Sequence, residues 1–175
     1  MSANRFTFVE QARLDDQARF FLWQSDMQLS GQSTVLRDRG GHIPTFATAD
    51  EARTYAQSKG LTVQHEGGAH VYDVDAVRKW CHDPRPDTLN PVQVFMAWKL
   101  LDDAAVTAFP NALPGEPDRV ADQLITNLGT HLTGAAQPPP GWEPHRWTLD
   151  EAQALAGLLR PGVERLAREF GSFAA

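Results

Sequence analysis

The sequence has a single cysteine, no long apolar run and no excess of positive charge, and each of these shortages excludes a class of protein. Cys81 alone cannot form an internal disulfide, which favours a reducing compartment. No window stays apolar for the length that a membrane helix needs, and residues 1–17 contain no run typical of a signal peptide. We therefore expect a cytoplasmic protein that does not cross a membrane.

The balance of charge argues against nucleic acid as a partner. The formal net charge is -6, whereas phosphate backbones are bound by Lys and Arg side chains that displace counterions. Residues 102–122 carry five acids and one base, so most of the acidity lies in one short stretch. This stretch is either a solvated loop and helix end or a docking surface for a protein partner with a basic surface.

The familiar catalytic and phosphate-binding motifs are missing as well. No glycine-rich nucleotide loop, no G-x-S-x-G and no H-E-x-x-H occurs in the chain. The glycine pairs at 40–41 and 67–68 do not have the spacing of a phosphate-binding loop. These shortages favour a binding protein over an enzyme, and we expect neither a cofactor nor a metal ion.

What is present is the pattern of a single α+β domain over residues 1–175. With 42% apolar residues, a chain of this length buries a sizeable core. Residues 1–72 are rich in strand signals and predict an N-terminal antiparallel sheet of short strands. Residues 73–175 are rich in helix signals, with a proline-rich connector at 134–147. Strands first and helices later is the order of an α+β domain.

Start and stop signals delimit the helices. The sequences T-A-D-E at 48–51 and T-L-D-E at 148–151 are capping boxes. Asp73 and Asn90 are placed to cap two further helices. Pro161 should kink or break the last helix, because proline has no N–H to donate.

The segment HVYDVDAVRKWCHDP, residues 70–84, combines histidines, aspartates and the cysteine, and it resembles a metal or catalytic cluster at first sight. Its spacing argues against that interpretation. Asp73 and Asp75 are two residues apart and diverge on a helix, and no second cysteine accompanies Cys81. Cys81 also lies near the C-terminal end of the predicted helix, where the dipole disfavours a thiolate. We interpret the segment as a capped helix with a buried, unreactive thiol.

Two features remain as candidates for function. Asp102 and Asp103 follow a long apolar run in the helix predicted at 91–109, which should be buried on several sides. Trp142 and Trp147 flank the end of the connector, where they would anchor an interface if exposed or pin the connector to the core if folded back. The candidate contact residues are Asp102, Asp103, Asp118, Asp122, Trp142 and Trp147.

Three segments, TFATADEARTYAQSKGLTV, HVYDVDAVRKW and FMAWKLLDDAA, resemble a group of small bacterial α+β proteins. In that group a capped helix precedes a short strand, a Y-D-x-D-x-[VLA]-x-x-W segment and a helix with a W-N-L-x-D-like run. The similarity covers roughly residues 45–106, with Lys99 in place of the asparagine. No established reaction comes with the group. Some small acidic α+β proteins of this type are immunity proteins that neutralise a toxin, so the resemblance implies a fold and, by analogy, protein binding.

Two hypotheses follow from the sequence. The first is an immunity-type or regulatory domain that binds a protein partner through an acidic surface. The alternative is an enzyme or small-ligand binder with a pocket between the sheet and the helix at 91–109. Its polar groups would be Asp102, Asp103 and either His70 or His82. Convergence of these side chains in one concave site would favour the alternative.

Overall fold

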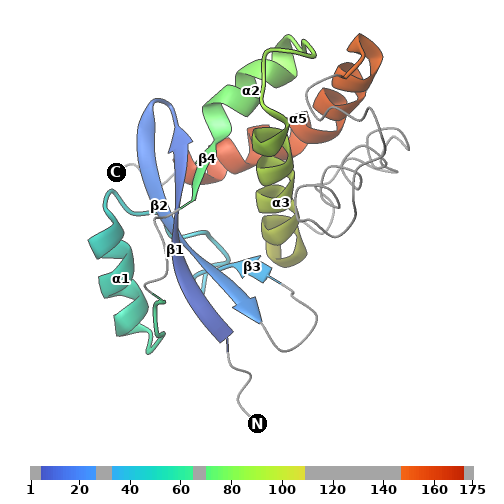
Figure 1. The fold of residues 1–175 in the computed structure, drawn as a ribbon. Coiled ribbons are helices and arrows are strands. Elements are labelled where there is room, and N and C mark those ends of the chain that lie inside the picture. The colour runs from blue at the N-terminus through green and yellow to red at the C-terminus, as the bar shows by residue number, and fades with distance from the viewer. Residues whose placement is uncertain (1–4, 27–32, 65–69, 109–146, 172–175) are drawn as a thin grey trace.

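A four-stranded sheet forms the middle layer of the computed structural model, which describes residues 5–26, 33–64, 70–108 and 147–171 (Figure 1). Strands β1 (Arg5–Leu14), β2 (Gln17–Asp26), β3 (Ser33–Val35) and β4 (Val71–Asp73) lie in the order β3-β2-β1-β4. Helix α1 (Ala49–Ser58) covers one face, and α2 (Val74–His82), α3 (Pro91–Ala108) and α5 (Leu149–Gly171) lie on the other. The α+β class predicted from the sequence is confirmed.

The sheet is mixed rather than wholly antiparallel. Strands β1, β2 and β3 pair antiparallel as predicted, but β4 pairs in parallel with β1. The chain passes from β3 to β4 through α1, and a helical crossover of this kind returns a strand in the same direction. Strands β1 and β2 have 10 residues each, so the prediction of uniformly short strands is wrong for the central pair.

The two faces of the sheet carry separate cores because strand side chains alternate. Leu22 packs with Ala52 and Ala56 of α1 on one face. Phe21, the preceding residue, belongs to the larger core on the other face, where its ring lies 5.5 Å from that of Phe170 in α5. No described helix is long and apolar enough to span a membrane.

The helices begin where the capping signals predict. Thr48 and Glu51 form the reciprocal capping box of α1, and Asp73 accepts a hydrogen bond of 2.9 Å from the N–H of Ala76 at the start of α2. Cys81 is buried in α2, and burial raises the pKa of its thiol to about 12. The thiol therefore stays protonated at neutral pH, in agreement with its interpretation as a core residue.

Helix α5 runs through Pro161 without a break, so of the two outcomes predicted there, a kink or a break, the break does not occur. Proline removes one main-chain hydrogen bond, but core contacts on both sides of it hold the helix together. The buried side chains that make these contacts are Leu155 and Leu159 before the proline, and Val163 and Leu166 after it. Tertiary packing thus outweighs a local signal.

The turn between β1 and β2 is held by a residue from α2. Asp15 and Asp16 both have positive φ, 50° and 58°, as a two-residue hairpin turn requires. The carboxylate of Asp75 accepts hydrogen bonds from the N–H of Asp15 at 3.0 Å and of Asp16 at 2.9 Å. Asp75 therefore fixes the hairpin against the start of α2.

Candidate functional site

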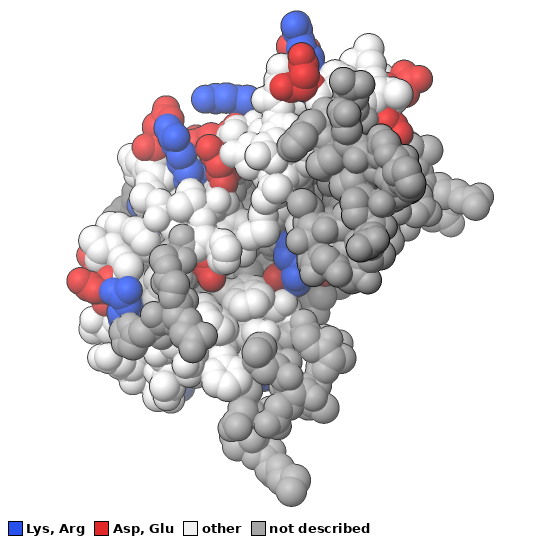
Figure 2. All heavy atoms as spheres, viewed as in Figure 1, with Lys and Arg blue, Asp and Glu red and all other residues white. Residues whose placement is uncertain are grey.

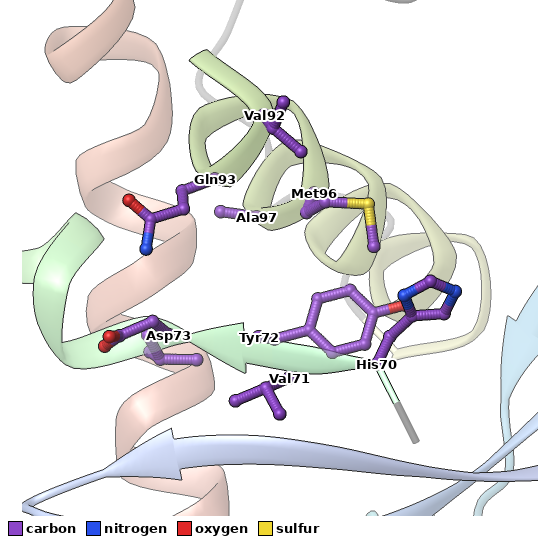
Figure 3. Close-up of a pocket in the computed structure, with 9 residues that line it drawn as sticks. His70, Val71, Tyr72, Asp73, Val92, Gln93, Met96 and Ala97 are labelled. Atoms are coloured by element: carbon purple, nitrogen blue, oxygen red, sulfur yellow. The ribbon is translucent and has the colours of Figure 1, made fainter. Parts of the chain in front are cut away.

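A pocket of about 220 Å³ lies between strand β4 and the first turns of α3 (Figure 3). Its walls are largely apolar and include Val71 from β4 and Val92 and Met96 from α3, and Figure 3 shows Tyr72 as the β4 side chain turned toward the helix. Three large apolar side chains are exposed in the described part of the chain. Two of them, Val71 at 56% and Val92 at 42%, line this one pocket. Single exposed apolar residues are common, but two that meet in a hollow indicate a binding surface.

The local sequence explains why α3 begins beside β4. The side chain of Asn90 accepts a hydrogen bond of 2.8 Å from the N–H of Val92, and Pro91 occupies the first helical position, where its missing N–H costs nothing. Val92 and Met96 are four residues apart and so share one face of the helix. In β4, alternation buries Tyr72 and leaves Val71 exposed.

Polar side chains occupy the two ends of the β4–α3 pocket. Figure 3 shows Asp73 and Gln93 at one end and His70 at the other. One carboxylate oxygen of Asp73 caps α2, which leaves the other as an acceptor. In the described part of the chain, no hydrogen bond joins two of the lining side chains. The arrangement therefore offers an apolar cavity with polar groups at its ends rather than an assembled nucleophile and base.

A layer of buried carboxylates lies behind the pocket. Glu10 of β1 is 7% exposed and accepts a hydrogen bond of 2.9 Å from the N–H of His70. Burial raises the pKa of Glu10. Burial, assisted by the charges of Glu10 and Asp103, raises the pKa of Tyr72, whose hydroxyl is therefore neutral at physiological pH. The strand that lines the pocket is thus tied to β1 through a side chain as well as the main chain.

Asp103 belongs to this buried layer and is 3% exposed. Trp23 Nε1 donates a hydrogen bond of 2.8 Å to one carboxylate oxygen, and Lys99 Nζ lies 2.5 Å from the other. Lys99 also donates to Ser33 Oγ at 3.0 Å. Oδ2 of Asp103 therefore ties α3 to β2, and Oδ1 holds Lys99 of the same helix, which reaches β3 through Ser33. The prediction that Asp103 forms part of a contact surface is wrong.

The other predicted contact residues are either less exposed than a contact surface requires or lie outside the described residues. Asp102 is half-buried, its pKa is raised chiefly by burial, and it does not line the β4–α3 pocket. Trp147 is 9% exposed and its ring lies 5.9 Å from that of Trp80, so its predicted role as an interface anchor is wrong. It packs into the core, which is the other interpretation left open by the sequence. Asp118, Asp122 and Trp142 lie outside the described residues.

The pocket occupies the place that the alternative hypothesis named, but with a different set of polar groups. Only His70 of the four proposed side chains lines it. His82 lies at the end of α2, with Nε2 3.1 Å from Glu164 Oε1. The apolar residues Val71 and Val92 were missed, because exposure cannot be told from residue type. The sequence signal that could have helped to locate the pocket was the cap at Asn90 and Pro91, which fixes the position of the first turn of α3.

Charged side chains do not gather into one patch on the face seen in Figure 2, where acidic and basic groups alternate. Exposed ion pairs in the described part of the chain include Arg53–Asp50 and Arg13–Asp16. Among the residues described, no three His, Cys, Asp or Glu side chains are grouped so as to hold a metal ion.

Comparisons with known proteins add a single distant likeness in fold. Neither a scan against protein-family models nor a search of curated proteins gave a match. The structure is similar to one described as the crystal structure of the SatS C-terminal domain in complex with bromine, with a TM-score of 0.43 and 19% sequence identity. The similarity covers 94% of this chain and 91% of the other. A likeness at this level carries no argument about function.

Proposed function

We propose that this chain is a protein-binding domain that takes up an extended, apolar segment of its partner at the β4–α3 pocket. The observation that carries the proposal is the joint exposure of Val71 and Val92 in one hollow beside a sheet edge. Strand β4 is the last strand of the described sheet on that side. An edge strand next to an apolar pocket is the arrangement by which proteins bind extended peptides.

The outer edge of β4 offers main-chain groups to such a segment. Gln11 of β1 donates its N–H to the carbonyl of His70 at 3.0 Å and pairs with Val71 in a parallel register. In this pattern Gln11 bonds to residues 70 and 72, so the N–H and C=O of Val71 point away from β1. A partner strand would bond to these groups and place one apolar side chain in the pocket, beside Val92 and Met96.

The size of the pocket supports a side chain as its occupant. A volume of about 220 Å³ can hold one large side chain, and it is below the roughly 300–1,000 Å³ that is usual for drug-sized ligands. At one end, Asp73 and Gln93 would accept a hydrogen bond from a Lys, Arg or amide group of the partner, which suits the acidic character of the chain. An immunity-type or regulatory factor works in this way, because it binds a segment of its partner without changing the partner chemically.

A photo-crosslinking residue, p-benzoylphenylalanine, at position 92 tests the proposal in cells that contain the natural partner. Leu149 provides the matched control, because it is another large apolar residue at a helix start and is 53% exposed. We expect a protein adduct from position 92 and none from position 149. An adduct with the mass of a small molecule would instead identify a small-ligand site.

Affinity measurements with the captured protein, purified, complete the test. Val92→Asp should weaken binding by about ten- to a hundredfold, the equivalent of losing one buried apolar side chain. Leu149→Asp should leave the affinity unchanged. Equal effects of the two substitutions, or none from either, would refute the proposal.

A further inference from the structure

A second pocket, of about 230 Å³, lies on the α1 side of the sheet, between the C-terminal end of α1 and the segment that follows β3. Its walls combine apolar side chains, Leu36, Tyr55 and Leu61, with three basic ones, Arg37, Arg39 and Lys59. This is an unusual concentration of basic groups in a chain with 22 acidic and 16 basic residues. We call it the α1 pocket.

The one acid of the α1 pocket, Asp38, is committed to the turn in which it stands. Its Oδ1 accepts hydrogen bonds from the N–H of Gly40 at 2.8 Å and of His42 at 3.0 Å. The bond from His42, followed by that from Gly40, lowers the pKa of Asp38. Asp38 therefore stays ionised and is held in the turn, and the three bases outnumber it in the pocket lining.

Contacts outside the pocket hold two of its walls in place. Arg37, whose side chain is 11% exposed, lies 3.6 Å from Glu169 and donates to the carbonyl of Gly41. The ring of Tyr55 packs at 5.2 Å against that of Phe46. These contacts provide a fixed cationic side and a fixed aromatic wall, which reduces the ordering cost of binding.

Arg39 and Lys59 are the groups available to a ligand. Among the described residues neither has a carboxylate within ion-pair distance, whereas Arg53 and Arg85 pair with acids nearby. Lys59 Nζ lies over the ring of Tyr55, 5.1 Å from its centre, so its ammonium stands against the aromatic wall of the pocket. The last carbonyls of α1 accept bonds from residues 59 to 61, which limits their repulsion of an anion.

We propose that the α1 pocket binds a small aromatic carboxylate. The ring would lie against Tyr55 between Leu36 and Leu61, with the carboxylate toward Arg39 and Lys59. The apolar walls favour an apolar group, the ring of Tyr55 favours a planar one, and the two bases favour an anion, while the volume excludes a ligand as large as a dinucleotide. This binding is independent of the function proposed for the β4–α3 pocket, which lies on the other side of the sheet.

Nuclear magnetic resonance titration of the full chain with benzoate tests the inference, with benzamide and benzamidine as neutral and cationic probes of the same shape. We expect benzoate to shift the resonances of Leu36, Tyr55 and Leu61, and benzamidine to leave them unchanged. Added salt should weaken the benzoate effect, since the attraction is largely electrostatic. Inorganic phosphate, an anion without a ring, should bind more weakly than benzoate.

Variants identify the bases responsible. Arg39→Gln and Lys59→Gln should each weaken benzoate binding by about two- to fivefold, the scale of an exposed ion pair. Lys79→Gln, at an exposed position on α2, should have no effect. The inference is overturned if benzamide or benzamidine binds as tightly as benzoate, if the Lys79 variant weakens binding equally, or if millimolar benzoate shifts none of the three resonances.

Discussion

Asp102 and Asp103 are adjacent, and the same substitution at each should have opposite consequences. Asp103 is buried and accepts hydrogen bonds from Trp23 and Lys99, whereas Asp102 is half-buried and its pKa is raised chiefly by burial. Asp103→Asn therefore removes a charge that stabilises the fold through its hydrogen bonds to Trp23 and Lys99. Asp102→Asn removes a charge that the fold disfavours at neutral pH.

The contacts of Asp103 set the size of the effect. Hydrogen bonds to a charged group contribute about 1.5–3 kcal/mol each, and Asp103 accepts two. Asn offers one oxygen to the Trp23 N–H but no charge to Lys99, whose side chain is 33% exposed and regains part of its hydration. We therefore expect Asp103→Asn to lower the free energy of unfolding by about 2–3 kcal/mol. Asp102→Asn should leave it unchanged or slightly higher.

Urea unfolding at pH 7, followed by tryptophan fluorescence, measures both variants. Trp23 lies in the Asp103 contact and reports on it directly. The double variant with Lys99→Met should recover part of the loss, because it removes the cation left without its partner. Equal losses from the two single variants would show that Asp103 is not the internal anchor of α3.

Four further substitutions test other parts of the structure. Asp75→Ala should lower the free energy of unfolding by about 1–3 kcal/mol in urea, because it removes the acceptor of two hairpin N–H groups. Burial raises the pKa of Glu10, so the wild type should lose stability as the pH rises from 4.5 through that pKa. Glu10→Gln should not show this loss, and parallel curves of unfolding free energy against pH for the two proteins would contradict the reasoning. Gly162→Ala should be less stable than Gly157→Ala by about 1–2 kcal/mol, because its new Cβ would lie 2.9 Å from Leu101 Cδ1 and that buried side chain must shift. Gly157→Ala, with open space around it, should raise the melting temperature instead.

Local signals predicted the elements because they act through neighbours in the chain. The capping box at Thr48 and the caps at Asp73 and Asn90 are formed as expected, since each joins a side chain to an amide two or three residues away. At Pro161 the local signal did not break the helix, because buried contacts from distant residues hold α5 together. A local rule is reliable only when no tertiary contact opposes it.

The candidate site was predictable in position but not in composition. Apolar residues all round the helix at 91–109 indicated that it would pack on the sheet, and a pocket does lie there. Helical periodicity places Asp102 and Asp103 about 100° apart. It does not say which of the two faces Trp23, 80 residues away in sequence. The carboxylate pair therefore resembled a surface site, although one member is an internal anchor.

The sequence by itself determined the α+β class, the helix starts and the burial of Cys81, because these depend on composition, periodicity and capping over a few residues. Only the tertiary structure decided that β4 is parallel, that Asp103 and Trp147 are internal, and that Val71 and Val92 meet in one pocket. Each of these depends on which residues distant in the chain come together. Residue type alone cannot reveal exposure, because apolar side chains serve equally in a core and in a binding surface.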